Sequence, residues 1–215
     1  MKVAIIGSGI VGRVLAAGFA KEGYEVSIGT RDTTKEELVK FQSENPGITI
    51  GTIKDVATDA AIILLAVSGD AALAALDLAG KENLSGKLLI DATNPIAKEP
   101  PTDGVLKFFT DSNNSLMEQI QAHVPEAKVV KAFNSVGNAF MYKPDFAGIK
   151  PTMFICGNDA DAKKTVTEIL DKFGWETEDM GKATSARVIE QLCILWCLPG
   201  FLNNQWQHAF KLLKK

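Results

Sequence analysis

Short apolar runs alternate with amphipathic stretches along most of the chain, and this alternation predicts strands separated by helices. The run AIILLAV at 61–67 is apolar at every position, which is typical of a parallel strand covered on both faces. The apolar runs predict strands over residues 2–6, 25–29, 48–50, 61–67, 87–91, 128–133 and 151–157. The amphipathic stretches predict helices over residues 10–22, 34–45, 53–60, 70–79, 114–123 and 160–173.

Repeated strand–helix–strand units favour right-handed crossovers and therefore an α/β fold, a doubly wound, mostly parallel Rossmann sheet with a C-terminal helical segment. We expect a Rossmann domain over residues 1–182. Residues 183–215 are expected to form a helical segment that packs on this core or on a partner subunit. Pro199 and Gly200 are expected to break that segment into two helices. Its first half is apolar on several faces, which favours a homodimer.

A glycine-rich turn, GSGIVG, follows the first predicted strand and opens the first predicted helix. Gly7 permits a tight turn, Gly9 leaves room for a pyrophosphate, and Gly12 lets the helix lie close to the strand. The start of the helix then offers free N–H groups and the positive end of its dipole to the phosphates. This combination predicts a dinucleotide site.

The second predicted strand ends at IGTRD, where an NAD-binding protein usually carries a carboxylate for the ribose hydroxyls. This chain has Thr30 and Arg31 there, with Lys35 one helical turn later. A hydroxyl, a planar guanidinium and an ammonium group suit a 2′-phosphate, so we predict NADP as the cofactor. Asp32 is the alternative NAD carboxylate, but it lies beyond the strand tip and we interpret it as a helix-capping residue.

Ligands of doubly wound sheets bind beyond the carboxyl ends of the strands, so the residues after each strand are the next candidates. Hydroxyl and amide groups there would hold the ribose and the nicotinamide carboxamide. A purely structural role in a turn explains the presence of Asn94 and Asn134 as well as a binding role does, because Asn favours turns. The candidates at these tips are Ser68, Gly69 and Asp70, Ala92 to Pro95, and Phe133 to Asn138, which includes Val136 and Gly137.

Few side chains in the sequence are suited to proton transfer. Neither histidine, His123 or His208, follows a predicted strand, and Lys131 is the only candidate acid or base near a strand end. Reduction of an alcohol or ketone requires a positioned proton donor, whereas hydride transfer between two redox cofactors requires mainly the alignment of two rings. Cys193 and Cys197 share a helix face but have no further metal ligand nearby, so we expect no metal site.

Composition narrows the classes of partner. The 215 residues carry a net charge of −3 with both signs interspersed, which disfavours nucleic acid and anionic membranes as partners. No apolar run approaches the ~20 residues of a membrane-spanning helix, and the N-terminus already reads as a strand. We therefore expect a cytoplasmic protein. The loop over 92–113, with its segment TNPIAKEPPTDG, is long enough to cover a second ligand.

The segments KVAIIGSGIVG, IGTRD, DATNP and KAFNSVG together resemble the coenzyme F420-dependent NADP oxidoreductases and their bacterial relatives. The cytoplasmic domains of eukaryotic six-transmembrane metalloreductases are similar as well. The resemblance extends over essentially the whole chain, including TSARVIEQLCILW. It implies that Ser8, Gly9, Ile10 and Val11 contact the pyrophosphate, and that Thr30, Arg31 and Lys35 contact the 2′-phosphate. It also implies that Ala66, Val67 and Ala71 flank the cofactor, and that residues 134–138 line the nicotinamide and deazaflavin rings.

The chain departs from the archaeal members of that family near the implied deazaflavin site. Those enzymes have an aromatic residue and a proline where Ser68 and Gly69 stand here, and a different motif in place of FNSVGN. The acceptor therefore stays open among F420, FMN and FAD. Two alternatives also stay open: reduction of a small carbonyl or imine, with Lys131 or Asn134 in proton transfer, and a non-catalytic NADP-binding module. No catalytic residue is assigned.

Overall fold

The computed structural model describes residues 1–215 and contains one eight-stranded sheet with the order β3-β2-β1-β4-β5-β6-β7-β8. Neighbouring strands are parallel throughout except for β6 and β7, which are antiparallel. The strands are β1 (Lys2–Ile6), β2 (Glu25–Thr30), β3 (Ile48–Thr52), β4 (Ile62–Leu65), β5 (Leu88–Asp91), β6 (Lys128–Lys131), β7 (Thr152–Gly157) and β8 (Glu176–Asp179).

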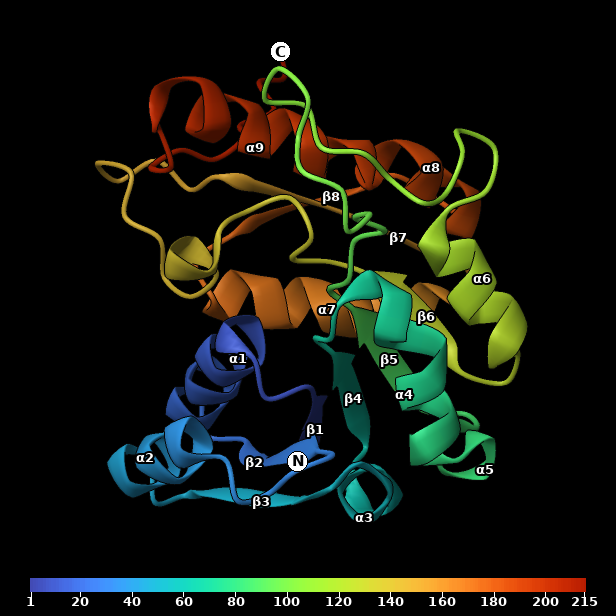
Figure 1. Cartoon of the computed structure of the whole chain (residues 1–215). Coiled ribbons are helices and arrows are strands. Elements are labelled where there is room, and N and C mark those ends of the chain that lie inside the picture. The colour runs from blue at the N-terminus through green and yellow to red at the C-terminus, as the bar shows by residue number, and fades with distance from the viewer.

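Helices cover both faces of this sheet (Figure 1). Alternate residues of each strand point to opposite faces, so Val3 and Ile5 join one hydrophobic core with α1, α2 and α7, whereas Ala4 and Ile6 join a second core with α3, α4 and α6. The α-helices are α1 (Ile10–Lys21), α2 (Glu36–Glu44), α3 (Ile53–Asp59), α4 (Ala72–Ala79), α5 (Lys81–Leu84), α6 (Leu116–His123), α7 (Ala160–Lys172), α8 (Ala186–Ile189) and α9 (Gln191–Asn203). Three 3₁₀ turns are η1 (Gly69–Ala71), η2 (Asn138–Phe140) and η3 (Ala183–Ser185).

The strand order places a topological switch point between β1 and β4. The chain winds outward from β1 through β2 to β3, and then returns to the other side of β1 with β4, β5 and β6. A crevice forms at such a point beyond the carboxyl ends of the strands. The doubly wound, mostly parallel fold predicted from the sequence is confirmed, and it brings the tips of β1, β2, β4 and β5 to one edge.

One strand is absent from the sequence prediction. The stretch ETED over β8 has no apolar run, and all four of its residues are exposed or half-buried. It is an edge strand held only by β7, so it has no hydrophobic pattern to reveal it.

The predicted break at Pro199 and Gly200 is wrong. Helix α9 continues through both residues to Asn203, and the chain leaves it at Asn204 in a left-handed conformation. A proline leaves the carbonyl four residues earlier without its helical donor. That residue, Leu195, lies on the exposed side of α9.

The chain after Asn204 forms an irregular tail that folds back on α9 and then follows β7. The indole of Trp196 donates to the carbonyl of His208, and the Thr152 amide donates to the carbonyl of Phe210. The predicted second helix of this segment is therefore not formed.

The helical segment Ala183–Asn203 spans 21 residues and is apolar enough to cross a membrane by length and composition. A core helix meets the same criteria, and this segment contributes Ile189, Cys193 and Trp196 to the interior. It packs over the β6–β8 side of the sheet (Figure 1).

Candidate functional site

The glycine turn between β1 and α1 has the geometry that the sequence predicts. Gly7 has φ +122°, and a Cβ there would lie 2.3 Å from the carbonyl oxygen of Ala66. A Cβ on Gly12 would lie 2.0 Å from the carbonyl oxygen of Gly7. A Cβ on Gly9 would meet nothing within 4 Å. Gly7 and Gly12 are therefore required by packing, whereas the space over Gly9 is open to a ligand.

Helix α1 presents an uncapped N-terminus to that space. Gly9 is its N-cap residue, and no side chain satisfies the first N–H groups. No acidic residue lies in the first turn, so the positive end of the helix dipole is not neutralised from within the chain. This arrangement suits an anionic ligand.

The tip of β2 is shaped by Thr30, which is buried. Its hydroxyl lies 3.1 Å from the Ser8 hydroxyl, so the tip of β2 and the glycine turn are joined directly. The Asp32 carboxylate accepts from the amide and hydroxyl of Thr34, at 2.9 and 2.7 Å. Helix α2 begins at Glu36 with Lys35 as its N-cap, so Asp32 stabilises the turn before the helix and the predicted helix-capping role is wrong.

Arg31 and Lys35 extend from this turn and form no ion pair within the chain. Both line a cavity of about 560 Å³, which we call the β2 cavity. Its other wall is apolar and comes from the face of α4. The residues around it are Gly7, Ser8, Gly9, Gly29, Thr30, Arg31, Asp32, Lys35, Ile53, Ala66, Val67, Ser68, Ala71, Ala74, Ala75 and Leu78.

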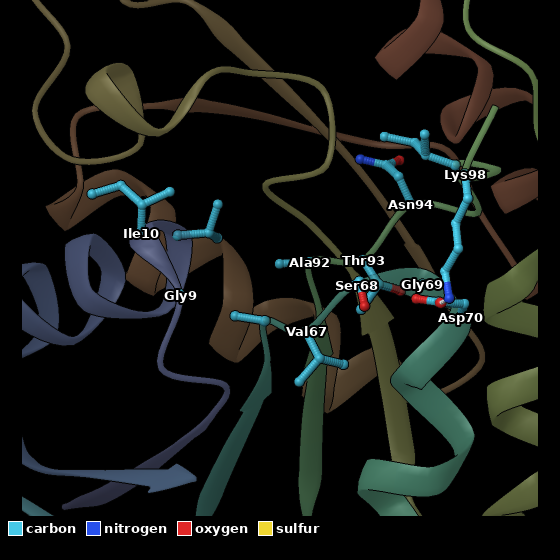
Figure 2. A pocket seen from close by; sticks show the side chains of 13 residues that line it. Gly9, Ile10, Val67, Ser68, Gly69, Asp70, Ala92, Thr93, Asn94 and Lys98 are labelled. Carbon is cyan, nitrogen blue, oxygen red and sulfur yellow. Dashed lines mark ion pairs between the residues drawn. The ribbon is translucent and has the colours of Figure 1, made fainter. Parts of the chain in front are cut away.

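A second cavity of about 640 Å³, the β5 cavity, lies at the tips of β1, β4 and β5 (Figure 2). It shares Gly9, Ala66, Val67 and Ser68 with the β2 cavity, so the two are contiguous around the start of α1. Its lining residues are Gly9, Ile10, Val11, Ala66, Val67, Ser68, Gly69, Asp70, Ala92, Thr93, Asn94, Ile96 and Lys98.

The only charged side chains in the lining of the β5 cavity are Asp70 and Lys98, which form an ion pair at 2.8 Å. Hydrogen bonding to Lys98 lowers the pKa of Asp70, and hydrogen bonding to Asp70 raises the pKa of Lys98. Both pKa values therefore move away from neutrality, opposite to the tuning of a general acid or base.

Asn94 is held in the wall of the β5 cavity by Asn134. The Asn94 amide nitrogen donates to the Asn134 carbonyl at 2.8 Å, and its amide oxygen accepts from the Asn134 side chain at 3.2 Å. The Asn134 side chain also donates to the carbonyl of Ile189 at 3.0 Å, which ties this wall to the C-terminal segment. The side-chain oxygen of Asn134 is buried without a partner.

Most of the predicted site residues meet at these two cavities. The exceptions are Pro95 and the whole stretch from Phe133 to Asn138, including Asn134, Val136 and Gly137, which are not in the lining of either one, and Gly12, which lies behind the turn. Gly137 packs against the ring of Trp196, where a Cβ would lie 2.5 Å from the nearest ring carbon. The roles predicted for these residues in ring binding stay predictions.

Sequence reasoning missed the apolar wall formed by Ile53 and α4, and it missed the contribution of Ile96 and Lys98. The wall has no motif, because its spacing is that of any buried helix. Lys98 lies in the long loop after β5, and the loop's length was the one indication of it.

Lys131 is fully buried and does not reach either cavity. Its ammonium lies 2.7 Å from Asp91 and 2.9 Å from Glu190, and donates to the carbonyl of Thr93. Burial alone would lower the pKa of Lys131, but the two carboxylates outweigh it and the pKa is raised. This lysine is a charged structural link between β5, β6 and the C-terminal segment.

The histidines also lie away from the cavities. His123, at the end of α6, pairs with Asp77 at 2.7 Å, and His208 lies in the tail against Trp196. The glycine turn and the uncapped start of α1, at the switch point of this sheet, define a dinucleotide-binding protein of the Rossmann class.

Comparisons with known proteins identify the family. Residues 2–95 match the family model described as "NADP oxidoreductase coenzyme F420-dependent". The F420-dependent NADP reductase of Methanocaldococcus jannaschii is 30% identical over 205 residues, which cover 89% of each chain. A crystal structure from Arthrobacter sp. FB24, provisionally assigned as an F420-dependent NADP reductase, is 35% identical, has a TM-score of 0.93 and matches both chains over their full length.

The rat metalloreductase STEAP3 is 30% identical over 206 residues, which cover 94% of this chain but only 39% of that protein. The chain thus spans about two fifths of STEAP3 and nearly all of the archaeal reductase. The chain belongs to the F420-dependent NADP oxidoreductase family and is an NADP-dependent oxidoreductase.

Proposed function

We propose that the protein transfers hydride between NADPH and a flavin-like acceptor, either the deazaflavin F420 or a flavin nucleotide. The observation that carries this proposal is the contrast between the two cavities. The β2 cavity has two cations without an ion-pair partner in its lining, whereas the β5 cavity has no side chain tuned for proton transfer. An acceptor ring that takes a hydride and draws its proton from water needs no such side chain.

The β2 cavity fits the adenosine half of NADP. Arg31 and Lys35 would hold the 2′-phosphate with the Thr30 hydroxyl, and the apolar face of α4 would pack on the adenine. Gly9 and the first N–H groups of α1 would hold the pyrophosphate between the two cavities. NADPH supplies the hydride, which is one proton with two electrons, and leaves as NADP⁺.

The β5 cavity fits the nicotinamide and the acceptor ring. Asn94 keeps one amide hydrogen free after bonding to Asn134, and this hydrogen is available to the carboxamide of the nicotinamide. Ile96 and Val67 provide apolar contact for flat rings. Water that enters the open side of the cavity supplies the proton that accompanies the hydride.

Reduction of a small carbonyl or imine fits the site less well. It needs a proton donor beside the substrate. Lys131, the donor that the sequence suggested for such a reaction, lies behind the cavity wall between two carboxylates.

The decisive experiment is a titration of the purified protein with F420, FMN and FAD in the presence of NADPH, followed at the nicotinamide absorbance band. Oxidation of NADPH that depends on one of these acceptors supports the proposal. Tight NADPH binding with no transfer to any of them would instead support a non-catalytic NADP-binding module. Turnover with small imines or ketones alone would assign the protein to the alternative reductase class.

We further propose that the protein is a homodimer and that α9 forms part of the interface. Leu195, Phe201 and Leu202 are exposed on α9, and Val188 is exposed on α8. Leu202 also lies against Gly104 of the loop that follows β5, so an interface here would include the loop that lines the β5 cavity at Ile96 and Lys98. Light scattering of the wild type and of Leu195→Glu tests this: a dimer that the variant splits is expected, and a monomeric wild type would contradict it.

A further inference from the structure

The β5 cavity contains a cation whose position is set by a folded loop. The loop after β5 returns on itself, with the Ala97 amide donating to the Lys107 carbonyl at 2.8 Å and the Phe109 amide donating to the Pro95 carbonyl at 2.9 Å. Ile96 and Phe108 form an isolated antiparallel bridge. The backbone directly before Lys98 is therefore anchored to residues 107–109 of the same loop.

The Lys98 side chain crosses from this loop to the start of η1, where it meets Asp70 (Figure 2). The side chain of Lys98 is 88% exposed and that of Asp70 38% exposed. An ion pair between such exposed groups is worth little, because water and salt screen both charges. A stronger anion that enters the cavity can therefore take Lys98 from Asp70.

The charge balance of the site indicates what this anion is. In the proposed binding mode the phosphates of NADP have partners elsewhere, because Arg31 and Lys35 would hold the 2′-phosphate and the start of α1 would hold the pyrophosphate. Lys98 is the one cation in the lining of the β5 cavity. A second ligand that carries its own phosphate would find only this partner in the cavity.

We propose that Lys98 is the binding residue for the phosphate on the side chain of the acceptor, and that Asp70 is its counter-ion while the acceptor is absent. Lys98 thereby selects phosphorylated flavins or deazaflavins over acceptors without a phosphate. This inference rests on the proposed function, since it requires a flavin-like acceptor in the β5 cavity.

The test compares FMN with riboflavin, which have the same ring and differ by one phosphate. For the wild type at saturating NADPH, KM is expected to be lower for FMN than for riboflavin. Lys98→Gln should raise the KM for FMN about 5- to 20-fold and should change that for riboflavin much less, as expected for loss of a partly screened charged hydrogen bond. Asp70→Asn should lower the KM for FMN by about 2-fold, because it removes the competing carboxylate.

Lys107→Gln is the matched control. Lys107 lies on the same loop, is exposed and pairs with Glu99 at 2.7 Å, but it does not line the cavity. In this variant the ratio of the KM for FMN to the KM for riboflavin should stay at the wild-type value. If Lys98→Gln raises the KM for NADPH instead, the phosphate it binds belongs to the dinucleotide, and the proposal is overturned.

Flavin fluorescence titration of the protein loaded with NADP⁺ separates this inference from the proposed function. If neither flavin is reduced, the proposed function fails for these acceptors, and the affinities still decide the role of Lys98. Tighter binding of FMN than of riboflavin, lost in Lys98→Gln, supports the inference. Equal affinity of the wild type for both flavins overturns it, whether or not either one is reduced.

Discussion

Replacement of Arg31 by alanine should remove most of the preference for NADPH over NADH. Arg31 lies at the tip of β2, is exposed in the β2 cavity and has no carboxylate partner to lose. Its removal therefore breaks no hydrogen bond or ion pair of its side chain within the folded chain. The loss should fall on the 2′-phosphate, which NADPH has and NADH lacks.

The magnitude follows from the kind of contact and its exposure. A hydrogen bond to a charged group is worth about 1.5–3 kcal/mol, and the open side of the cavity places Arg31 toward the lower part of this range. A loss of about 2 kcal/mol corresponds to about a 30-fold fall in kcat/KM for NADPH, since 1.4 kcal/mol is a factor of ten. Thr30 and Lys35 remain and should retain a small preference.

The assay measures kcat/KM for both nucleotides with one fixed acceptor, or their affinities by fluorescence if no acceptor is found. Lys40→Ala is the control, because Lys40 is an exposed cation on α2 that does not line the cavity. It should leave the ratio of the two values unchanged. The reasoning is refuted if Arg31→Ala changes that ratio by less than about 3-fold or weakens NADH to the same extent as NADPH, because a charged phosphate contact must distinguish them.

Three further perturbations test other parts of the structure. Gly9→Val should leave thermal stability unchanged but abolish detectable NADPH binding by calorimetry, because the valine side chain enters the open space that the ligand would occupy. Gly12→Ala should instead lower the free energy of unfolding by about 1–3 kcal/mol, because its methyl group meets the backbone of Gly7. The opposite pattern would contradict the assignment of the two glycines. Lys131→Met should lower the free energy of unfolding by about 3–5 kcal/mol in denaturant titrations, because two buried carboxylates lose their cation, and a loss below about 1 kcal/mol would be inconsistent with a buried charged link. Arg187 lowers the pKa of Glu118 from its ordinary 4.5 to about 2, so this contact stabilises the fold above pH 4.5 and the stabilisation is lost as the pH falls toward 2. The free energy of unfolding should fall between pH 6 and pH 3 in both proteins, but by about 1–2 kcal/mol less in Glu118→Gln than in the wild type. An equal fall in both would exclude a stabilising contribution from the Glu118 carboxylate.

The NADP half of the site is the part that a sequence can reveal. Gly7, Gly9 and Gly12 lie within one turn, and Thr30 and Arg31 end the next strand, so the relevant residues are close in sequence and their roles are set by local geometry. The strand order then follows from the repeated right-handed crossovers. The short edge strand β8 and the one-turn helix α5 escaped this reasoning because neither has a distinctive hydrophobic pattern. The C-terminal segment was predicted wrongly because α9 continues through Pro199 and Gly200.

The acceptor half depends on contacts between distant parts of the chain. Lys98 meets Asp70 across 28 positions, and Asn134 meets Ile189 across 55. No spacing or motif announces such contacts, because each residue type is common in loops and turns. Lys131 shows the same limitation: its position before a strand tip was visible in the sequence, but its two carboxylate partners were not.

The C-terminal segment connects the fold to the choice of acceptor. Glu190 accepts from the amides of Leu116 and Met117 at the start of α6 and also pairs with Lys131, so this carboxylate fixes α6 and β6 together. The preceding carbonyl, that of Ile189, holds Asn134 and through it the wall at Asn94. None of these contacts reaches the β2 cavity, to which we assign the preference for NADP as a proposal. The two halves of the site are thus built from separate sets of interactions, so substitutions in the C-terminal segment can change the acceptor while the preference for NADP is kept.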